Sequence, residues 1–365
     1  MAVIAARFIS SPHDAIGAAP VVKLWLTTTI GLVFAMIVVG GATRLTNSGL
    51  SITEWQPILG VIPPLTEADW QDALEKYRQI PQYREINRGM SMAEFQFIYW
   101  WEWAHRFLGR LIGVVYGLPL LVFWVRGMLP TRHLPLMVGL LLLGGLQGFV
   151  GWYMVQSGLV ERTEVSQYRL ALHLSIAFVI LSLLVWLRLA IEPERRSSLQ
   201  SITLKTISPA HVSVAIGLVA LVFAQVALGA FVAGTKAGLT YNTWPLMDGR
   251  LIPNGVYGLD PWWVSIGEDI TTIQFNHRMS AYVLTIVAVW HAVVLALTAD
   301  CRRTVVSANI LAISVLLQSA IGIATLLYAT NAIPIGLGLA HQAGGAVVMA
   351  IAVWHSYAIR RATAA

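Results

Sequence analysis

The sequence has 365 residues, of which 57% are hydrophobic and only 12% are charged, and its mean hydropathy is +0.68. About a quarter of the residues in soluble domains are charged, so this composition excludes an ordinary water-soluble protein and indicates a membrane protein. We attribute the net charge of +6 to basic loop residues that set membrane topology, not to nucleic-acid binding. The single cysteine, Cys301, excludes an intrachain disulfide.

Eight apolar segments are long enough to cross a hydrocarbon core, which takes about 20 helical residues. In chain order they are 24–45, 97–125, 134–153, 170–189, 212–232, 273–297, 305–328 and 335–359. The first 23 residues lack a short apolar core followed by a small-residue cleavage site, so we interpret them as a retained tail. We therefore predict an all-α integral membrane protein with eight transmembrane helices.

The basic residues of the connecting segments lie on one side of the predicted membrane. They follow the second, fourth, sixth and eighth apolar segments: Arg126, Arg132, Arg188, Arg195, Arg196, Lys205, Arg302, Arg303, Arg360 and Arg361. Because cytoplasmic loops are enriched in Lys and Arg, we expect both termini in the cytoplasm. The two long connections, 46–96 and 234–272, then face the opposite, outer side.

Landmarks recur along the chain at a nearly constant spacing, which indicates a duplicated four-helix unit. The spacing is 172 residues from His105 to His277, 171 from LQGFVG (146–151) to LQSAIG (317–322), and 189 from GLSITEW (49–55) to GLTYNTW (238–244). The longest spacing reflects an insert at 67–87, which we expect to form a surface helix, as a solvated connector or a lid. We predict two four-helix bundles, 1–200 and 201–365, related by a pseudo-twofold axis along the membrane normal.

Four histidines lie at equivalent depths, where the even-numbered segments enter from the outer side: His105, His173, His277 and His341. An ionisable side chain within a span is costly and usually faces the bundle interior. Since neutral imidazole is an axial ligand for haem iron, we predict two haem sites, His105 with His173 and His277 with His341. The residue four positions later is small in each case, which leaves space for a flat ring or for close helix packing: Gly109, Ala177, Ala281 and Gly345.

Arg106 and Arg278 each follow a predicted ligand at the outer interface. A guanidinium binds carboxylates through two parallel hydrogen bonds, so both are candidates for holding haem propionates. The alternative is an interfacial arginine whose long side chain reaches the headgroups. Zinc is the weaker choice of metal, because the histidine pairs lack the cysteine or acidic partners that zinc sites use.

Two further histidines, His291 and His355, lie 14 residues after His277 and His341. Fourteen residues span about 21 Å of helix and return close to the same face, so a second, inner haem is conceivable. The bulky residues four positions later, Leu295 and Ile359, speak against it. We do not expect an inner haem.

Several motifs together resemble those of the haem A synthase family, in its mitochondrial and alphaproteobacterial branch. They are GGATRLTNSGLSITEWQP (40–57), EWAHRFLGR (102–110), NTWPLMDG (242–249), FNHRMSAY (275–282) and AHQAGG (340–345). The resemblance covers essentially the whole chain. It implies oxidation of the C8 methyl group of haem O to the formyl group of haem A, a cofactor of terminal oxidases.

The resemblance also implies roles for individual residues. His277 and His341 correspond to the axial ligands of a tightly held haem b, and His105 and His173 to the residues of the haem O site. Glu54 matches the family's acidic residue beside the substrate. Its counterpart in the repeat is Thr243, so we expect only the first unit to be catalytic. A carboxylate there could stabilise positive charge or relay a proton; the alternative is a structural loop carboxylate.

From the loop charges we expect a multi-pass membrane protein with its haem sites toward the periplasm or its organellar equivalent, and the short amino-terminal tail favours a bacterial inner membrane over an organellar one. The partners that the family resemblance implies are the lipid bilayer, haem O, and the pathway that contains haem O synthase and terminal oxidase assembly, while a homo-oligomer stays open. Some family members carry cysteine pairs in the outer loops, which this chain lacks. A thiol-based electron route is therefore excluded here.

Two other functions compete with this interpretation. A non-catalytic di-haem b-type cytochrome would carry electrons across the membrane, and it requires inner haems at His291 and His355. A transporter would also fit parallel repeats, but it needs a polar site at the middle of the membrane. The polar residues within the spans are chiefly glutamines, which we expect to bridge helices: Gln147, Gln225 and Gln318.

Overall fold

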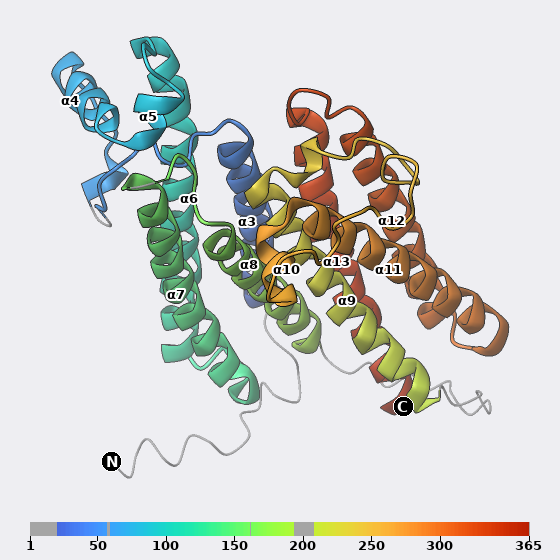
Figure 1. Ribbon diagram of the computed structural model, residues 1–365. Helices are drawn as coiled ribbons and strands as arrows, with labels where there is room; N and C mark the ends of the chain where they lie inside the picture. Colours follow the sequence, from blue (N-terminus) through green and yellow to red (C-terminus); the bar gives the residue numbers. More distant parts are fainter. Residues whose placement is uncertain (1–19, 57–58, 161, 193–207, 365) are drawn as a thin grey trace.

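The computed structural model describes residues 20–364 apart from 57–58, 161 and 193–207 (Figure 1). The part of the chain that it describes is helical and contains no β-strand. Eight of the helices in this part are long and apolar enough to cross a membrane, which confirms the predicted all-α membrane fold. The predicted boundary between units, at residues 200 and 201, lies outside the described residues, as do Arg195, Arg196 and Lys205.

The eight long helices match the eight apolar segments one to one. They are α3 (Pro20–Leu45), α6 (Met92–Val125), α7 (Leu134–Leu159), α8 (Gln167–Ala190), α9 (Pro209–Thr235), α11 (Ile270–Thr298), α12 (Arg302–Leu327) and α13 (Ile335–Ala364). The short helices are α4 (Glu67–Arg78), α5 (Pro81–Glu85), α10 (Ser265–Glu268) and four 3-10 turns, Leu59–Val61, Thr131–His133, Ala237–Leu239 and Trp262–Val264.

Six of the eight long helices begin at least three residues earlier than hydropathy predicts, and α6 and α11 show one cause, which is capping by polar residues. Helix α6 begins at Met92 instead of residue 97, since Ser91 and Glu94 form a reciprocal capping box. Helix α11 begins at Ile270 because the Asp269 carboxylate accepts hydrogen bonds from the first backbone N–H groups. A hydropathy window does not include these polar first turns.

The long helices form two sets of four with the same cycle of contacts. In the first set, α3 contacts α6, α6 contacts α7, α7 contacts α8, and α8 contacts α3; α9, α11, α12 and α13 repeat this order. Helices α3 and α8 of the first set pack against α13 and α9 of the second, with α6 and α7 at one edge of the molecule and α11 and α12 at the other (Figure 1). These contacts agree with a duplicated unit, while the symmetry axis stays a prediction.

The apolar side chains divide between a central core and an outer surface. The largest buried cluster joins the inner helices and includes Leu26 of α3, Phe178 of α8 and Met349 of α13. Leu118 and Ile286, on the outer helices α6 and α11, are 60% and 67% exposed. An exposed apolar surface of this kind suits contact with lipid chains.

The insert of the first outer loop packs firmly against the membrane bundle. Its helix α4 begins with a capping box between Thr66 and Asp69, and Leu74 and Tyr77 are buried against Phe95 of α6. Burial raises the pKa of the Tyr77 hydroxyl to about 12. The prediction of a surface helix is confirmed: one face of α4 belongs to a buried cluster, and the other face is exposed. Its role as a connector or a lid stays a prediction.

Candidate functional site

Each of the four predicted histidine ligands packs against a glycine on the preceding membrane helix. A Cβ atom added to the glycine would approach the histidine Cε1 atom in every case: Gly40 to His105 at 2.9 Å, Gly151 to His173 at 2.9 Å, Gly229 to His277 at 3.1 Å and Gly322 to His341 at 2.7 Å. The imidazole therefore occupies the space that a side chain would fill. Each of the four rings lies between two helices of its own unit, which is the position expected of a histidine that binds a group inside the bundle.

A glutamine one helical turn from the glycine contacts three of these histidines. Its amide Nε2 donates to the histidine backbone carbonyl and lies close to the imidazole ring. The carbonyl and ring distances are 2.9 and 3.4 Å for Gln147 and His173, 3.1 and 3.1 Å for Gln225 and His277, and 2.7 and 3.0 Å for Gln318 and His341. The prediction that these glutamines bridge helices is confirmed.

Two of the small residues four positions after the histidines, Gly109 and Gly345, face the preceding membrane helix. A Cβ added to Gly109 would lie 3.3 Å from the Met36 methyl group, and the Gln318 amide is the atom closest to Gly345, at 3.8 Å. At these two positions the space accommodates the side chain from the preceding span. Of the two interpretations left open by the sequence, close helix packing is the one that these contacts support.

The ring geometry of His277 and His341 fits one metal ion held between them. Their centroids are 6.4 Å apart, with the planes at 81°. An imidazole nitrogen binds a transition metal at about 2 Å, so two rings that share one ion have centroids about 6 Å apart. No group of three or more His, Cys, Asp or Glu side chains in the described ranges could hold a metal ion. Two axial imidazoles are what a haem iron takes from the protein, so the pair is compatible with the predicted haem ligands.

The first unit offers the equivalent histidines on α6 and α8. The Nδ1 atoms of His105 and His173 are buried and have no hydrogen-bond partner within the described part of the chain. Two buried imidazoles with unused polar atoms fit a ligand that would occupy the site. The pairing of His105 with His173 stays a prediction.

The geometry of His291 and His355 differs from that of the outer pair. Their Nε2 atoms are 3.1 Å apart, a hydrogen-bond distance, and the ring centroids are 5.2 Å apart. His355 Nδ1 is also 2.8 Å from the Ser307 hydroxyl. Because the two nitrogens contact each other directly, an iron would fit between them only if these side chains moved apart.

Arg106 and Arg278 hold the outer loops of the two units in the same way. Arg106 donates to the backbone carbonyl of Ile52 at 2.6 Å and to that of Glu54 at 2.8 Å. Arg278 donates to the carbonyls of the corresponding residues, Tyr241 and Thr243. Both guanidiniums are therefore engaged with backbone, and propionate binding, which stays a prediction, would need some of these bonds to open.

The sequence did not single out Glu102, although its carboxylate is the charged partner of Arg106. Its carboxylate is 3% exposed, pairs with Arg106 at 2.7 Å, and accepts from Ser51 Oγ and the Ile52 backbone N–H. The signal was the spacing of four residues between Glu102 and Arg106, which places both on one helix face. In the second unit the neutral Gln274 bonds to Arg278 at 3.2 Å in its place.

Glu54 lies at the outer end of the first unit, where the insert reaches it. Its carboxylate pairs with Lys76 of α4 at 3.0 Å, accepts from Gln56 at 3.0 Å, and is 48% exposed. Hydrogen bonds to Asp72 and to Glu54 raise the pKa of the Lys76 ammonium. The insert and Glu54 are both found only in the first unit, and Lys76 of the insert pairs with Glu54.

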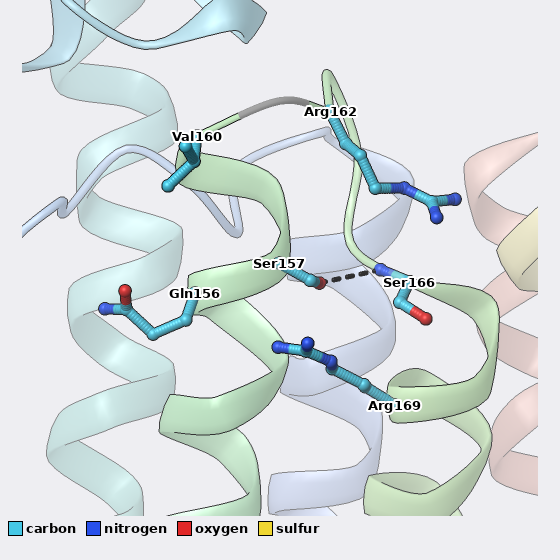
Figure 2. A pocket seen from close by; sticks show the side chains of 6 residues that line it. All are labelled: Gln156, Ser157, Val160, Arg162, Ser166 and Arg169. Atoms are coloured by element: carbon cyan, nitrogen blue, oxygen red, sulfur yellow. Dashed lines mark hydrogen bonds between the residues drawn. The ribbon is translucent and has the colours of Figure 1, made fainter.

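A polar pocket lies at the turn between α7 and α8 (Figure 2). Arg162 and Arg169 line it, and the Ser166 backbone N–H donates to Ser157 Oγ at 2.8 Å. Arg169 stacks on the Tyr153 ring at 3.7 Å and lies four residues before His173, on the same helix face. The pocket therefore places positive charge one turn outward from a predicted ligand.

Comparison with known proteins places this architecture in one family. The family model for cytochrome oxidase assembly protein, COX15-CtaA, matches residues 23–353. A heme A synthase of Parvibaculum lavamentivorans is 48% identical over 337 residues, 92% of this chain and 94% of the relative. A heme A synthase of Chelativorans sp. is 48% identical over 93% of this chain and 91% of the relative, and that of Sinorhizobium medicae is 46% identical over 92% and 88%. The chain belongs to the COX15-CtaA family of cytochrome oxidase assembly proteins.

Proposed function

We propose that this chain is a haem A synthase, an oxidoreductase that converts the C8 methyl group of haem O into the formyl group of haem A. The observation that carries the proposal is the relation to heme A synthases over more than nine-tenths of the chain. The four histidines, in two pairs at one end of two similar bundles, supply ligands that such a reaction needs.

The two units would divide the work. The second unit would hold a resident haem b between His277 and His341, whose ring separation of 6.4 Å suits a single iron. The first unit would bind haem O through His105 and His173, because Glu54 and the insert belong to this unit. A bound haem b would supply one-electron redox chemistry, and the chain's own contribution is to hold both porphyrins near the same membrane surface.

Glu54 would act on the substrate from the outer end of the first unit. Oxidation of a methyl group releases protons and develops positive charge, which a nearby carboxylate can accept or stabilise. Lys76, Gln56 and the Arg106 bond to its backbone carbonyl hold Glu54 in place. Glu54 and the four histidines would lie on the periplasmic side of a bacterial inner membrane, because the basic loops lie on the opposite, cytoplasmic side.

The competing function, a di-haem carrier across the membrane, has less support. It requires inner haems at His291 and His355, and these two side chains are directly hydrogen-bonded to each other. The partners implied by the proposed function are haem O, the lipid bilayer, and the proteins that make haem O and assemble terminal oxidases. A homo-oligomer is neither required nor excluded by the arrangement.

The test is extraction and mass analysis of the haems that copurify with the full chain, wild type beside Glu54→Ala. We expect haem O or haem A together with haem B in the wild type, and loss of haem A in the variant. Haem B alone in both samples would refute the synthase and support the carrier.

A further inference from the structure

The seam between α6 and α7, the line along which these two helices meet, differs from the equivalent seam between α11 and α12. Far fewer residues of α6 approach α7 than residues of α11 approach α12. In the second unit the hydroxyl oxygens of Thr285 and Ser319 are 3.2 Å apart, so a hydrogen bond joins α11 to α12. Val315, one turn before Ser319, is 2% exposed. The seam of the second unit is therefore closed by packed side chains.

The equivalent positions of the first unit are all glycines. They lie 172, 171 and 171 residues before Thr285, Val315 and Ser319, and they are Gly113, Gly144 and Gly148. A Cβ atom added to any of the three would meet no other group within 4 Å. Small residues in membrane helices usually permit close packing, but at these positions no neighbouring helix uses the space. The seam of the first unit is therefore open.

The open seam leads toward the two histidines of the first unit. On α6, Gly113 lies about two turns after His105, within the same helical stripe. On α7, Gly148 lies three residues before Gly151, which packs against His173. The Nδ1 atoms of both histidines are buried and have no hydrogen-bond partner in the described part of the chain. Two imidazoles with unused ring nitrogens thus lie inside the unit that is open at its side.

The outer end of the same unit is covered. Leu50 of the outer loop packs with Tyr77 of the insert and Phe95 of α6, and a Cβ added to Gly158 of α7 would lie 2.7 Å from the Leu50 side chain. Arg106 ties the loop to α6 through two backbone carbonyls. A molecule as large as a porphyrin would have to displace this packing to enter from the outer aqueous side.

The side with the open seam is the side that suits lipid. Helices α6 and α7 form one edge of the molecule (Figure 1). Val114 on α6 and Phe149 on α7, next to the glycines in sequence, are 53% and 56% exposed. A porphyrin is a flat, largely apolar molecule, and apolar surface favours hydrocarbon over water. Such a molecule can therefore approach the seam within the bilayer.

We propose that the seam between α6 and α7 is a lateral portal, through which the first unit takes up haem O from the bilayer and releases haem A into it. The inference rests on the proposed function and deepens it by naming the route of the substrate. A synthase must exchange the haem on which it acts and retain the one that assists it. The open and closed seams of the two units match this requirement.

The experiment fills the seam in the full-length chain, reconstituted in lipid vesicles. Gly113→Leu combined with Gly148→Leu places two side chains in the open space. Gly139→Leu is the matched control, because a Cβ there also meets nothing within 4 Å and nine residues, two and a half turns, place it on the opposite face of α7 from Gly148. Size-exclusion chromatography and thermal unfolding establish that each variant is folded.

Haemin dissolved in the vesicle lipid is the probe. Its absorption change on binding gives the uptake rate, its transfer to apomyoglobin gives the release rate, and titration gives the dissociation constant. The double leucine variant should slow both uptake and release of the rapidly exchanging haem by about tenfold, since side chains that must be pushed aside act as overpacking does. The dissociation constant should stay unchanged, because an obstacle on the route raises the barrier equally in both directions. Gly139→Leu should behave as the wild type does.

Two further variants keep the test decisive. If the leucines prevent folding or weaken binding, Gly113→Thr combined with Gly148→Ser fills the seam with the side chains of the second unit. The reverse exchange, Val315→Gly combined with Ser319→Gly, opens the seam of the second unit and should accelerate release of the slowly exchanging haem.

Unchanged uptake and release in the folded seam variants would overturn the inference, as would equal slowing by Gly139→Leu. A change confined to release, with a matching change in the dissociation constant, would assign the glycines to the binding site and also refute the portal. The proposed function fails by a different result. If the wild type contains neither haem O nor haem A, the synthase is refuted, yet the exchange rates of haemin still report on the seam.

Discussion

The contact between Gly229 and His277 gives a direct test of the histidine site. Alanine at position 229 would place a methyl group 3.1 Å from His277 Cε1, closer than ordinary van der Waals contact. The imidazole must shift by a few tenths of an ångström, and because it is held between two helices this shift moves it away from its present position. We expect Gly229→Ala to weaken haem binding in the second unit.

The magnitude follows from the cost of overpacking a fixed side chain, about 1–3 kcal/mol. At 1.4 kcal/mol per factor of ten, this corresponds to roughly 5- to 150-fold weaker retention of haem. Gly217, in the same helix, is the matched control, since a Cβ there meets no atom within 4 Å. Replacing a helical glycine with alanine where the new methyl group meets no neighbour stabilises a helix by up to about 1 kcal/mol, so Gly217→Ala should bind haem as the wild type does.

The assay is the haem content per chain after purification, with the absorption spectrum and thermal unfolding of each variant. Gly229→Ala should lose the low-spin spectrum of the second unit while Gly217→Ala keeps it. Equal haem content and identical spectra in the two variants would show that His277 does not bind iron in the orientation described, and the site would have to be rebuilt.

Three further predictions follow from other contacts. Arg106→Ala leaves the buried Glu102 carboxylate unpaired and should destabilise the fold by about 3–5 kcal/mol, whereas Glu102→Gln, which reproduces the neutral partner of the second unit, should be milder in thermal unfolding. His355→Ala should cost about 1–3 kcal/mol through the unpaired His291 and leave the haem content unchanged; loss of a haem would revive the inner site. Burial raises the pKa of the Tyr77 hydroxyl to about 12, so the contribution of Tyr77 to the stability of α4 is present below pH 10 and is lost as the pH rises toward 12. In Tyr77→Phe, proteolysis of the insert should no longer increase over this pH range. An unchanged increase would assign the loss of stability to another titrating group.

The sequence predicts most of the fold because the bilayer leaves few alternatives. Eight apolar segments of sufficient length must become eight helices, and the repeat predicts the same neighbours in each unit. Helix starts such as Met92 and Ile270 were missed because capping residues are polar. The packed face of α4 was missed because the helical spacing of Leu74 and Tyr77 is equally compatible with a helix that lies loosely on the surface.

The site was predictable in its ligands and less so in its supports. The four histidines stood out because ionisable residues are rare in membrane spans. The glycines opposite them did not, since glycine is common in such helices, although LQGFVG and LQSAIG contain both the glycine and the glutamine. The engagement of Arg106 with a loop carbonyl depends on how the chain returns over the helix end, which no local pattern specifies.

The differences between the two units concentrate in the first one, and they concern charge and the closure of one seam between helices. The paired helices contact each other in the same order, and Arg106 and Arg278 hold equivalent loop carbonyls. The first unit nevertheless has a buried carboxylate where the second has Gln274, and Glu54 where the second has Thr243. Under the proposed function, a duplicated scaffold that keeps its order of helix contacts while one copy has charge beside its histidines would separate holding a haem from acting on one, which is the division of work that oxidation of one porphyrin beside another requires.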